Sequence, residues 1–344
     1  MKVVVIPAYQ PDEQLGLLVS ELVQHELGIL VVDDGSGPDY NTIFETISSD
    51  AVVIHSEENM GKGAALKKGF SVLNQYFPDC EWVITADADG QHSVTDILRV
   101  AGQCEGRLRY LLTVRESTKE MPFKSKLGNT LSRFVYTILN NHYFKDNQSG
   151  LRAFSKDELE VMLSAGGDAY DYELNALCYA DKTGIPMKTM PVETLYFNGN
   201  SNTHFNAFKD TLRIYLQLFK STWPALAGAL IAILCAVAGT ILWKYDKLYF
   251  SIVAAGVIAG AASVLLYRFV QFRKLGYRDD IREGVMWLFS VLVIWGLTAL
   301  CGHFLPVIPM AVAFLIAAVI TGVIKFFGLM GLYALAEKLN RPED

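Results

Sequence analysis

Short apolar runs alternate with amphipathic segments from the N-terminus to about residue 205. An apolar run bounded by turn-forming residues is typical of a buried strand, whereas apolar residues that recur every three to four positions are typical of a helix. Because the two kinds of segment take turns, the pattern predicts an α/β domain with a mainly parallel sheet. We expect strands at residues 3–7, 28–33, 51–55, 81–86 and 109–114, and helices at 13–26, 41–48, 62–77 and 93–104.

From Trp223 onward the pattern changes, and Ala, Val, Ile, Leu, Phe and Gly dominate the sequence. Four apolar segments follow one another at about 224–243, 248–270, 284–305 and 307–333. Each approaches or exceeds the roughly 20 residues that a helix needs to cross a bilayer. We therefore expect a domain of four transmembrane helices at 223–336. It either anchors and positions the first domain or also moves lipid across the membrane.

Lysine and arginine flank these segments unevenly, which predicts their orientation. Basic residues precede the first segment and surround the second connection, whereas the third connection, near His303, has none. The first domain, the second connection and the C-terminus are thus expected in the cytosol. Lys244 and Lys247 in the first connection are an exception, and Lys325 inside the last segment is unusual for a membrane span. We expect a multi-pass protein of the cell (inner) membrane.

The segment 206–222 joins the two domains and has the pattern of an amphipathic helix. Lys209 and Arg213 lie beside an apolar face formed by Phe208, Leu212, Tyr215, Leu216 and Phe219. Such a helix either lies flat on the membrane surface or packs on the globular half. We favour the first arrangement. The chain then has three parts: an α/β domain at 1–205, an interfacial helix at 206–222 and a membrane domain at 223–336.

The bulk composition excludes several classes of protein. A formal net charge of −6 argues against a general nucleic-acid binder, because phosphate backbones demand a basic surface. The five cysteines stand far apart and form no CxxC or His/Cys cluster, so we expect neither a zinc site nor a disulfide framework. A strand-like run stands where a signal peptide would begin, so we expect the first domain to remain in the cytosol.

The segment Asp87-Ala88-Asp89-Gly90-Gln91 follows the apolar run at 82–85, so two carboxylates stand where a strand ends. Sheets of parallel strands bind ligands outside the carboxyl ends of those strands. Carboxylate oxygens are hard ligands that suit Mg²⁺ or Mn²⁺ in contact with a substrate diphosphate, and Gln91 can add a third oxygen. The alternative is a capped turn, since Asp and Gly are common turn formers. We favour metal binding.

Two more polar clusters follow strand ends. Asp33 and Asp34 end the second strand, where they either accept hydrogen bonds from a ribose or base or form a turn. Tyr9 follows the first strand and can offer its ring or hydroxyl to a base. The segment Asn59-Met60-Gly61-Lys62-Gly63 stands at the start of a helix and can bring backbone N–H groups and the Lys62 cation near phosphates. It lacks the spacing and the Ser/Thr of a P-loop, which excludes a kinase or ATPase loop.

Four motifs resemble, in their order, those of the family 2 glycosyltransferases. They are Ile6-Pro7-Ala8-Tyr9, Val32-Asp33-Asp34-Gly35-Ser36, Asn59-Met60-Gly61-Lys62-Gly63-Ala64-Ala65-Leu66 and Ala86-Asp87-Ala88-Asp89-Gly90-Gln91. With a fifth segment, Asp146-Asn147-Gln148-Ser149-Gly150-Leu151-Arg152-Ala153-Phe154, they are similar to the dolichyl- and polyprenyl-phosphate sugar synthases. The resemblance covers about residues 1–220 and implies a GT-A-like fold with a Rossmann-like mixed sheet. The four apolar segments resemble the GtrA-type membrane domain.

The resemblance also implies roles for individual residues. It implies that the metal is held by Asp87, Asp89 and Gln91. It implies nucleotide contacts from Pro7, Ala8, Tyr9, Asp33, Asp34, Lys62 and Asp87. It implies catalytic roles for Asp89, Arg115, Asp146 and Arg152, with Arg115 at the acceptor phosphate.

The chain departs from the family pattern at two places. The usual Asn-Glu after the first tyrosine is replaced by Gln10-Pro11-Asp12-Glu13, which leaves the acidic nucleotide contact to Asp12 or Glu13. A second arginine for the acceptor phosphate is missing near Ser125, where Lys124 and Lys126 can replace it.

A basic stretch stands out in this acidic chain, formed by Arg115, Lys119, Lys124, Lys126 and Arg133. A phosphate monoester is already anionic near neutral pH, so as an acceptor it needs cations and alignment more than a general base. We expect this stretch to bind such a phosphate, and the alternative is a solvated basic loop. Asp146 then positions the acceptor or a water on the metal.

Two further residues keep open interpretations. Glu173 lies in an acidic helix start and either meets the sugar or stabilises that terminus. His204 either contacts the pyrophosphate or lies in a plain turn.

Together these features predict a metal-dependent, inverting transfer of a hexose from UDP-glucose or GDP-mannose to a polyprenyl or dolichyl phosphate. One alternative is transfer to an alcohol of a glycan or protein, and another is a non-catalytic flippase or scaffold. The Gln-x-x-Arg-Trp segment of processive polysaccharide synthases is absent from the sequence. We expect no nucleic-acid partner, and a homo-oligomer is left open.

Overall fold

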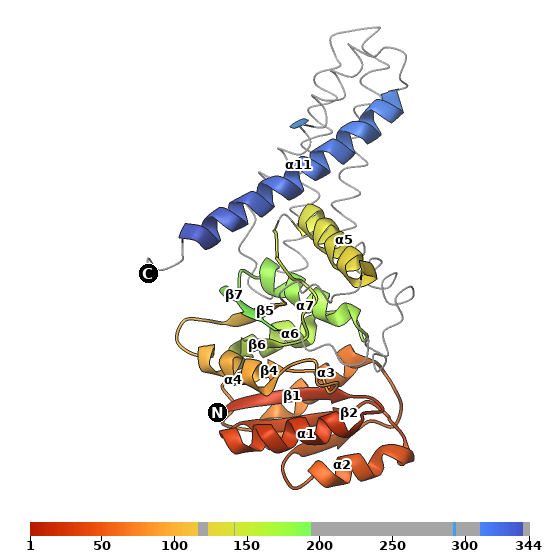
Figure 1. Cartoon of the computed structure of the whole chain (residues 1–344), viewed down its shortest axis with the longest axis vertical. Coiled ribbons are helices and arrows are strands. Elements are labelled where there is room, and N and C mark those ends of the chain that lie inside the picture. Colours follow the sequence, from red (N-terminus) through yellow and green to blue (C-terminus); the bar gives the residue numbers. More distant parts are fainter. Residues whose placement is uncertain (116–122, 141, 194–291, 294–309, 340–344) are drawn as a thin grey trace. The chain divides into compact units, whose positions relative to one another are not determined.

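The computed structural model describes residues 1–115, 123–140, 142–193, 292–293 and 310–339 (Figure 1). The chain divides into two compact units, the first formed by residues 1–129 and 145–217 and the second by 130–144 and 218–344. The first two predicted membrane segments, the third except for residues 292–293, the predicted interfacial helix at 206–222 and the segment around His204 lie outside the described residues.

The first unit contains a seven-stranded sheet with the order β3-β2-β1-β4-β6-β5-β7. Its strands are β1 (Lys2–Ala8), β2 (Gly28–Asp33), β3 (Val52–His55), β4 (Trp82–Thr85), β5 (Tyr110–Arg115), β6 (Arg152–Ser155) and β7 (Met187–Val192). The five strands predicted from the apolar runs are confirmed, each within one residue at either end.

The sheet is mixed because one strand runs against the others. β1 is parallel to β2 and β4, β2 to β3, and β5 to β7. β6 is antiparallel to both β4 and β5. In this register Thr85, the last residue of β4, pairs with Arg152, the first residue of β6. The loop before β6 therefore lies at the edge where β4 ends.

Helices cover both faces of this sheet (Figure 1). They are α1 (Glu13–Leu22), α2 (Asn41–Ile47), α3 (Lys62–Tyr76), α4 (Val94–Gln103), α6 (Leu159–Ser164) and α7 (Asp171–Lys182), with short 3-10 turns at Val23–His25, Pro38–Tyr40 and Lys156–Glu158. The four predicted helices are confirmed, but the first ends at Leu22 and continues only as a 3-10 turn. Glu26 then adopts a left-handed conformation, with φ of 45°.

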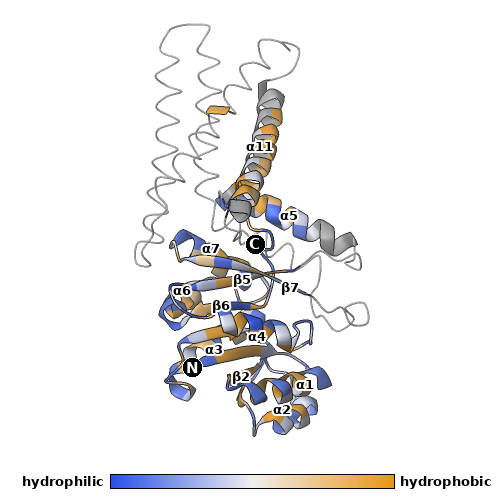
Figure 2. Ribbon diagram, turned by 60° about the vertical axis from the view of Figure 1, so that its left-hand side comes forward, coloured by the Kyte–Doolittle hydropathy of each residue, from blue (hydrophilic) through white to orange (hydrophobic). Residues whose placement is uncertain are grey.

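Alternate residues of β1 show how the two layers form. Val4 and Ile6 are fully buried in one core cluster with residues of α1, α2 and α4. Val5 faces the other way, toward α3, where a Cβ on Gly69 would lie 2.9 Å from its Cγ1. The side chains of a strand point alternately to its two faces, so each face needs its own helices. Figure 2 shows these buried strands as apolar ribbons.

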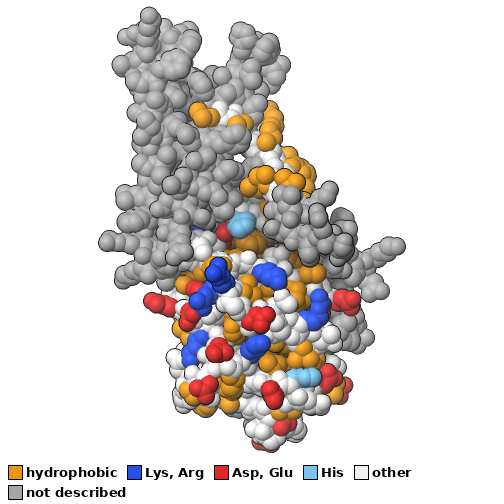
Figure 3. All heavy atoms as spheres, turned by 90° about the vertical axis from the view of Figure 1, so that its left-hand side faces the viewer, with side chains coloured by type: hydrophobic (Ala, Val, Ile, Leu, Met, Phe, Trp, Pro, Cys, Tyr) orange, Lys and Arg blue, Asp and Glu red, His pale blue; other side chains and the backbone are white. Residues whose placement is uncertain are grey.

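The described part of the second unit includes most of α5 (Phe123–Asn140) and all of α11 (Met310–Leu339). Phe326 of α11 packs against Phe134 and Tyr143, with ring centroids 5.3 and 5.8 Å away. Apolar side chains line much of α11 (Figures 2 and 3), and Val319 is 66% exposed. α11 overlaps the last predicted membrane segment. Within the described part of the chain, no helix meets the length and apolarity of a membrane span.

Candidate active site

The carboxyl ends of β1, β2 and β4 meet at one edge of the sheet, and β6 begins there because it runs the opposite way. β2 lies on one side of β1 and β4 on the other, so the strand order reverses at β1. Open α/β sheets bind ligands in the crevice at such a reversal. Asp33, Asp87 and the loop before Arg152 all lie at this edge.

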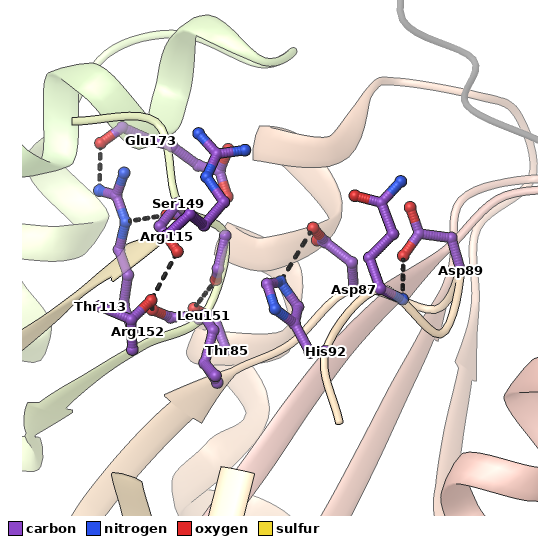
Figure 4. Close-up of polar contacts among 12 residues, drawn as sticks. Thr85, Asp87, Asp89, His92, Thr113, Arg115, Ser149, Leu151, Arg152 and Glu173 are labelled. Atoms are coloured by element: carbon purple, nitrogen blue, oxygen red, sulfur yellow. Dashed lines mark hydrogen bonds and ion pairs between the residues drawn. The ribbon is translucent and has the colours of Figure 1, made fainter. Parts of the chain in front are cut away.

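Asp87, just past β4, is held from three sides, and Figure 4 shows the side on which His92 lies. Its Oδ1 lies 2.6 Å from Nζ of Lys62, the first residue of α3. Its Oδ2 lies 3.4 Å from Nε2 of His92, and this buried nitrogen has no hydrogen-bond partner among the described residues. On the third side, a Cβ on Gly150 would lie 2.5 Å from Oδ2. The carboxylate therefore occupies a cradle that only glycine leaves open.

Lys62 is shared between two carboxylates. Its Nζ lies 2.6 Å from Asp87 and 2.9 Å from Oε1 of Glu173 in α7. Burial opposes the charged ammonium, but the two carboxylates outweigh it and raise the pKa of Lys62 above its usual range. Burial also opposes the charged carboxylate of Asp87, but Lys62 and His92 outweigh it and lower the pKa of Asp87. Both groups are therefore ionised at neutral pH.

Asp89 lies two residues further along and has a different environment. Its Oδ1 accepts the backbone N–H of Gln91 at 3.1 Å, which shapes the turn after β4. Burial and the negative charge of Asp87 together raise the pKa of Asp89, and the bond from Gln91 offsets only part of this effect. An extra positive charge at this point would therefore favour the ionised form of Asp89.

The three predicted metal ligands come together in one short turn, and their oxygens suit Mg²⁺ or Mn²⁺. Among the described residues, however, no three His, Cys, Asp or Glu side chains are grouped closely enough to hold a metal ion. The predicted set contains only two such side chains, since its third member is an amide; Asp87 contacts Lys62, and Asp89 accepts the backbone N–H of Gln91. The donor set fits a divalent cation whose remaining ligands come from elsewhere, such as the oxygens of a diphosphate.

The loop before β6 is tied to the neighbouring strands by threonine hydroxyls. Thr85 Oγ1 donates to the carbonyl of Gly150 at 2.7 Å. Thr113 Oγ1 donates to the carbonyl of Leu151 at 2.6 Å and lies 2.5 Å from Oγ of Ser149. All these contacts are buried, so Gly150 is fixed beside Asp87.

Arg115, the last residue of β5, forms a two-pronged ion pair with Asp146. Its Nε and Nη2 donate to the two carboxylate oxygens at 2.7 and 3.1 Å. Burial opposes the charge on Asp146, but the guanidinium of Arg115 and the hydrogen bonds from Arg115 and Gln148 outweigh it, so the pKa of Asp146 lies below its usual range. A carboxylate of lowered pKa is a poor general base and a strong orienting partner.

Arg152, which the resemblance placed among the catalytic residues, is buried, and its guanidinium points into the fold. It donates to the backbone carbonyls of Ser149, Asn147 and Glu173, and to the hydroxyl of Tyr110. These bonds join the loop before β6 to α7 and β5, and Figure 4 shows those to Ser149 and Glu173. The described contacts of Arg152 are those of a residue that holds the site together.

We expect Arg152→Met to lower the free energy of unfolding by about 3–5 kcal/mol, because several buried acceptors would lose their donor. Arg109→Met is the matched control, since Arg109 pairs with the 70% exposed Asp157 and should cost less than about 1 kcal/mol. Chemical unfolding followed by tryptophan fluorescence measures both. Equal effects of the two substitutions would contradict this role for Arg152.

Asp33 and Asp34 are both buried, and their carboxylates contact neighbouring parts of the chain. Asp33 accepts the N–H of Ser36 at 2.9 Å, and its other oxygen lies 2.9 Å from Nδ1 of His55. Asp34 accepts the N–H groups of Met60 and Gly61 at 3.0 and 2.8 Å. Burial raises the pKa of Asp34 more than these bonds lower it. Asp34 therefore joins the end of β2 to the loop that carries Lys62.

A cavity of about 390 Å³ opens beside Asp34. It is lined by Asp34, His55, Ser56, Glu57, Glu58, Met60, Ala64 and Lys68. Asp34 is the one predicted nucleotide-binding residue among those that line it.

The remaining predicted nucleotide contacts lie nearby along the chain. Pro7 and Ala8 end β1, and the carbonyl of Ala8 accepts the N–H of Asp34 at 2.8 Å. Tyr9 follows directly. Asp12 caps α1, where its Oδ1 accepts the N–H of Gln14 at 2.9 Å. One oxygen of Asp12 is thus used by its own helix.

The basic stretch predicted as an acceptor site is not one continuous loop. Arg115 ends β5, Lys119 lies outside the described residues, and Lys124, Lys126 and Arg133 belong to α5. These last three positions lie in a helix and not in a loop, and their binding of a phosphate stays a prediction. The helix arises because apolar residues recur at helical spacing between the basic ones.

Sequence reasoning did not assign His92 or Thr113 to the site, and it did not pair Lys62 with Asp87 and Glu173. His92 follows Gln91 directly, so its position beside a motif was a usable signal. Thr113 lies inside an apolar strand, and no sequence signal marked it as part of the site. Glu173 was noticed, but its partner, Lys62, is far away in the sequence.

The Glycosyl transferase family 2 model matches residues 3–158 of the chain. The UDP-N-acetylglucosamine–dolichyl-phosphate N-acetylglucosaminyltransferase of Methanococcus voltae is 31% identical over 215 residues, which are 56% of this chain and 84% of that protein. The undecaprenyl-phosphate 4-deoxy-4-formamido-L-arabinose transferase of Enterobacter sp. (strain 638) is 26% identical over 170 residues, or 46% of this chain and 50% of that protein.

A solved structure supports the fold. Glucosyl-3-phosphoglycerate synthase from Mycobacterium tuberculosis, in complex with Mn²⁺, uridine diphosphate and phosphoglyceric acid, superposes with a TM-score of 0.50. It is 18% identical and covers 64% of this chain and 78% of its own. The predicted GT-A-like mixed sheet is thereby confirmed, whereas these matches do not show the GtrA-like domain expected at 223–336. The chain belongs to glycosyl transferase family 2.

Proposed function

We propose that this enzyme transfers a hexose from a nucleotide sugar to a polyprenyl or dolichyl phosphate, with inversion at the anomeric carbon. One observation carries the proposal: the edge of the sheet that holds Asp87 and Asp89 also holds an arginine, Arg115, oriented by a buried carboxylate. An anionic donor and an anionic acceptor need this combination of groups. The named acceptors of the Methanococcus and Enterobacter relatives, dolichyl and undecaprenyl phosphate, support the same class of acceptor.

Asp87, Asp89 and Gln91 would hold Mg²⁺ or Mn²⁺ together with the donor diphosphate. The cation would neutralise charge on the departing nucleoside diphosphate. The chain's own contribution is to place two carboxylates and an amide within one turn fixed by the Gln91 N–H bond to Asp89. UDP-glucose and GDP-mannose are the donors that we propose to test first, followed by the UDP-N-acetylglucosamine named for the Methanococcus relative.

Arg115 would meet the acceptor phosphate, and Asp146 would orient it. Both oxygens of Asp146 contact the Arg115 guanidinium, and its pKa is lowered, so Asp146 is suited to hold a cation in place. A phosphate monoester needs no general base, because it is already anionic. The role proposed for Asp146 is therefore positioning. Arg152 would in turn support the loop that carries Asp146, through the carbonyl of Asn147.

Pro7, Ala8, Tyr9, Asp33 and Asp34 would surround the nucleoside, with Asp12 as a further contact. The cavity beside Asp34 supports this proposal because it lies at the edge where β2 ends. The carboxylates of Asp33 and Asp34 can still accept hydrogen bonds from ribose hydroxyls or base N–H groups, because each carboxylate oxygen has more than one lone pair.

The remaining part of the proposal concerns the membrane. The apolar segments within 223–336 would anchor the enzyme, and residues 206–222 would lie at the membrane surface, with the catalytic domain in the cytosol. The support is the sequence pattern together with relatives named for lipid-phosphate acceptors. A lipid acceptor requires that the active site stay close to a bilayer.

The full chain, purified in nanodiscs, tests the proposal with radiolabelled donors, a short polyprenyl phosphate and Mg²⁺ or Mn²⁺. We expect one donor to label the phosphate lipid, and excess EDTA to remove more than about 99% of the rate, since the cation stabilises the leaving group. The matched polyprenol, which lacks the phosphate, should stay unlabelled. Labelling of an alcohol acceptor alone, or of no acceptor with any donor, would overturn the proposal.

A further inference from the structure

Lys62 occupies a position where a cation is costly. It is the first residue of α3, at the end of the helix where the backbone dipole is positive, and its side chain is only 16% exposed. Two carboxylates offset this cost: Asp87, a proposed metal ligand, and Glu173, which is outside the proposed ligand set. A lysine that needed only one partner would be satisfied by Asp87. The second carboxylate therefore calls for an explanation.

Charge balance supplies one. The carboxylates of Asp87, Asp89 and Glu173 and the ammonium of Lys62 carry a net charge of −2 together, which a divalent cation would neutralise. The carboxylate of Asp87 cannot offer its Oδ1 fully to Lys62 and to a metal at once. When a cation engages Asp87, the ammonium needs another anion within reach, and Glu173 is already 2.9 Å away.

We propose that Lys62 is an exchangeable counter-ion of Asp87, and that Glu173 retains the lysine when Asp87 engages a divalent cation. This inference rests on the proposed function, because it takes Asp87 as a metal ligand. Lys62 and Glu173 are then positioning residues that set the affinity for the metal. The nucleotide contact expected of Lys62 from the sequence is a different role, and the two roles make different predictions.

The geometry allows the ammonium to remain paired with Glu173 when Asp87 turns to a cation. The three side chains come from different elements, α3, the turn after β4 and α7, and their charged atoms converge on one ammonium. The fold holds Glu173 independently of this ammonium, because its backbone carbonyl accepts a bond from the buried Arg152. Changing the Glu173 side chain thus leaves that bond intact.

Binding of Mn²⁺ alone to the full chain, followed by the electron paramagnetic resonance signal of free Mn²⁺, tests the inference. We expect Glu173→Gln to weaken Mn²⁺ binding by roughly tenfold, because Lys62 then has only Asp87 as a charged partner and competes with the metal. Lys62→Gln should strengthen binding by a similar factor. In the Lys62→Gln background, Glu173→Gln should change the affinity less than about twofold.

Asp168→Asn is the matched control. Its carboxylate lies 2.6 Å from Nζ of Lys67, which belongs to α3 as Lys62 does. The Asp168 side chain is 65% exposed and has no described contact with Asp87. Its substitution should leave Mn²⁺ binding unchanged. Circular dichroism verifies the fold of each variant, and the isosteric Glu173→Gln keeps the test decisive if the Lys62 variant does not fold.

The outcomes separate this inference from the proposed function. If the wild type binds no Mn²⁺, with or without uridine or guanosine diphosphate, the exchange is refuted, and if it also transfers no sugar with Mg²⁺ or Mn²⁺, both fail. If the wild type binds Mn²⁺ and Glu173→Gln binds it equally well, the exchange alone is refuted. Lys62→Gln could instead weaken nucleoside diphosphate binding and leave the binding of Mn²⁺ without nucleotide unchanged. Lys62 would then be a phosphate contact, and the inference would again be refuted.

Discussion

Asp89→Asn should lower the rate of sugar transfer by roughly a thousandfold while the fold stays intact. Asp89 Oδ1 accepts the N–H of Gln91, and the amide oxygen of asparagine can accept the same bond. The substitution therefore removes a charge and leaves the turn in place. Initial rates at saturating donor and Mn²⁺ measure the effect, with circular dichroism to verify the fold.

Asp157→Asn is the control for Asp89→Asn, because it removes one charge from an exposed ion pair with Arg109, which lies at the opposite edge of the sheet, where β5 begins and β6 ends. We expect its transfer rate to stay within about twofold of the wild type. An Asp89→Asn enzyme that keeps more than about a tenth of the wild-type rate would show that transfer does not depend on this carboxylate as a metal ligand.

The strands and helices of the first half were predictable because each has a local cause. Val3, Val4 and Val5 form an apolar run that needs burial on both faces, and the structure buries all three completely. Asp12 and Ser93 precede helices and cap them with their own oxygens, as short polar residues commonly do. Such signals lie within a few residues of the element that they define.

β6 was not predicted as an antiparallel insertion, and its effect on the site was missed. Its four residues, Arg152–Ser155, include two polar ones that are nevertheless buried. Burial of Arg152 depends on acceptors from Tyr110 and Glu173, which come from β5 and α7. A pattern of four residues carries no information about such distant partners. The motif at 146–154 therefore located the segment in the sequence but did not predict the structural role of Arg152.

The candidate site also has a part that the sequence predicted and a part that only the structure shows. The motifs located Asp87, Asp89 and Asp34, because each follows a strand whose end the apolar pattern defines. The pairing of Lys62 with Asp87 and Glu173 depends on how α3 and α7 cross the sheet. Residues at a strand end can be predicted from the sequence, whereas the partners that fix their charge require the fold.

Gly150→Ala should lower transfer by about a hundredfold and weaken Mn²⁺ binding, since a single methyl group would displace a proposed metal ligand. A Cβ at Gly150 would lie 2.5 Å from Oδ2 and 3.0 Å from Oδ1 of Asp87. The loop cannot retreat easily, because Thr85 holds the carbonyl of Gly150 at 2.7 Å. Asp87 must therefore move. Transfer rates and Mn²⁺ titrations on the same preparation measure the two effects.

Gly16→Ala provides the comparison, because a Cβ there meets nothing within 4 Å and the residue lies inside α1. Alanine favours a helix, so this variant should be more stable by about 0.5–1 kcal/mol and fully active. Gly150 does not have a positive φ, so backbone strain offers no other reason for its loss of activity. Normal Mn²⁺ binding and transfer by Gly150→Ala would mean that the position of Asp87 in this cradle does not matter to the reaction.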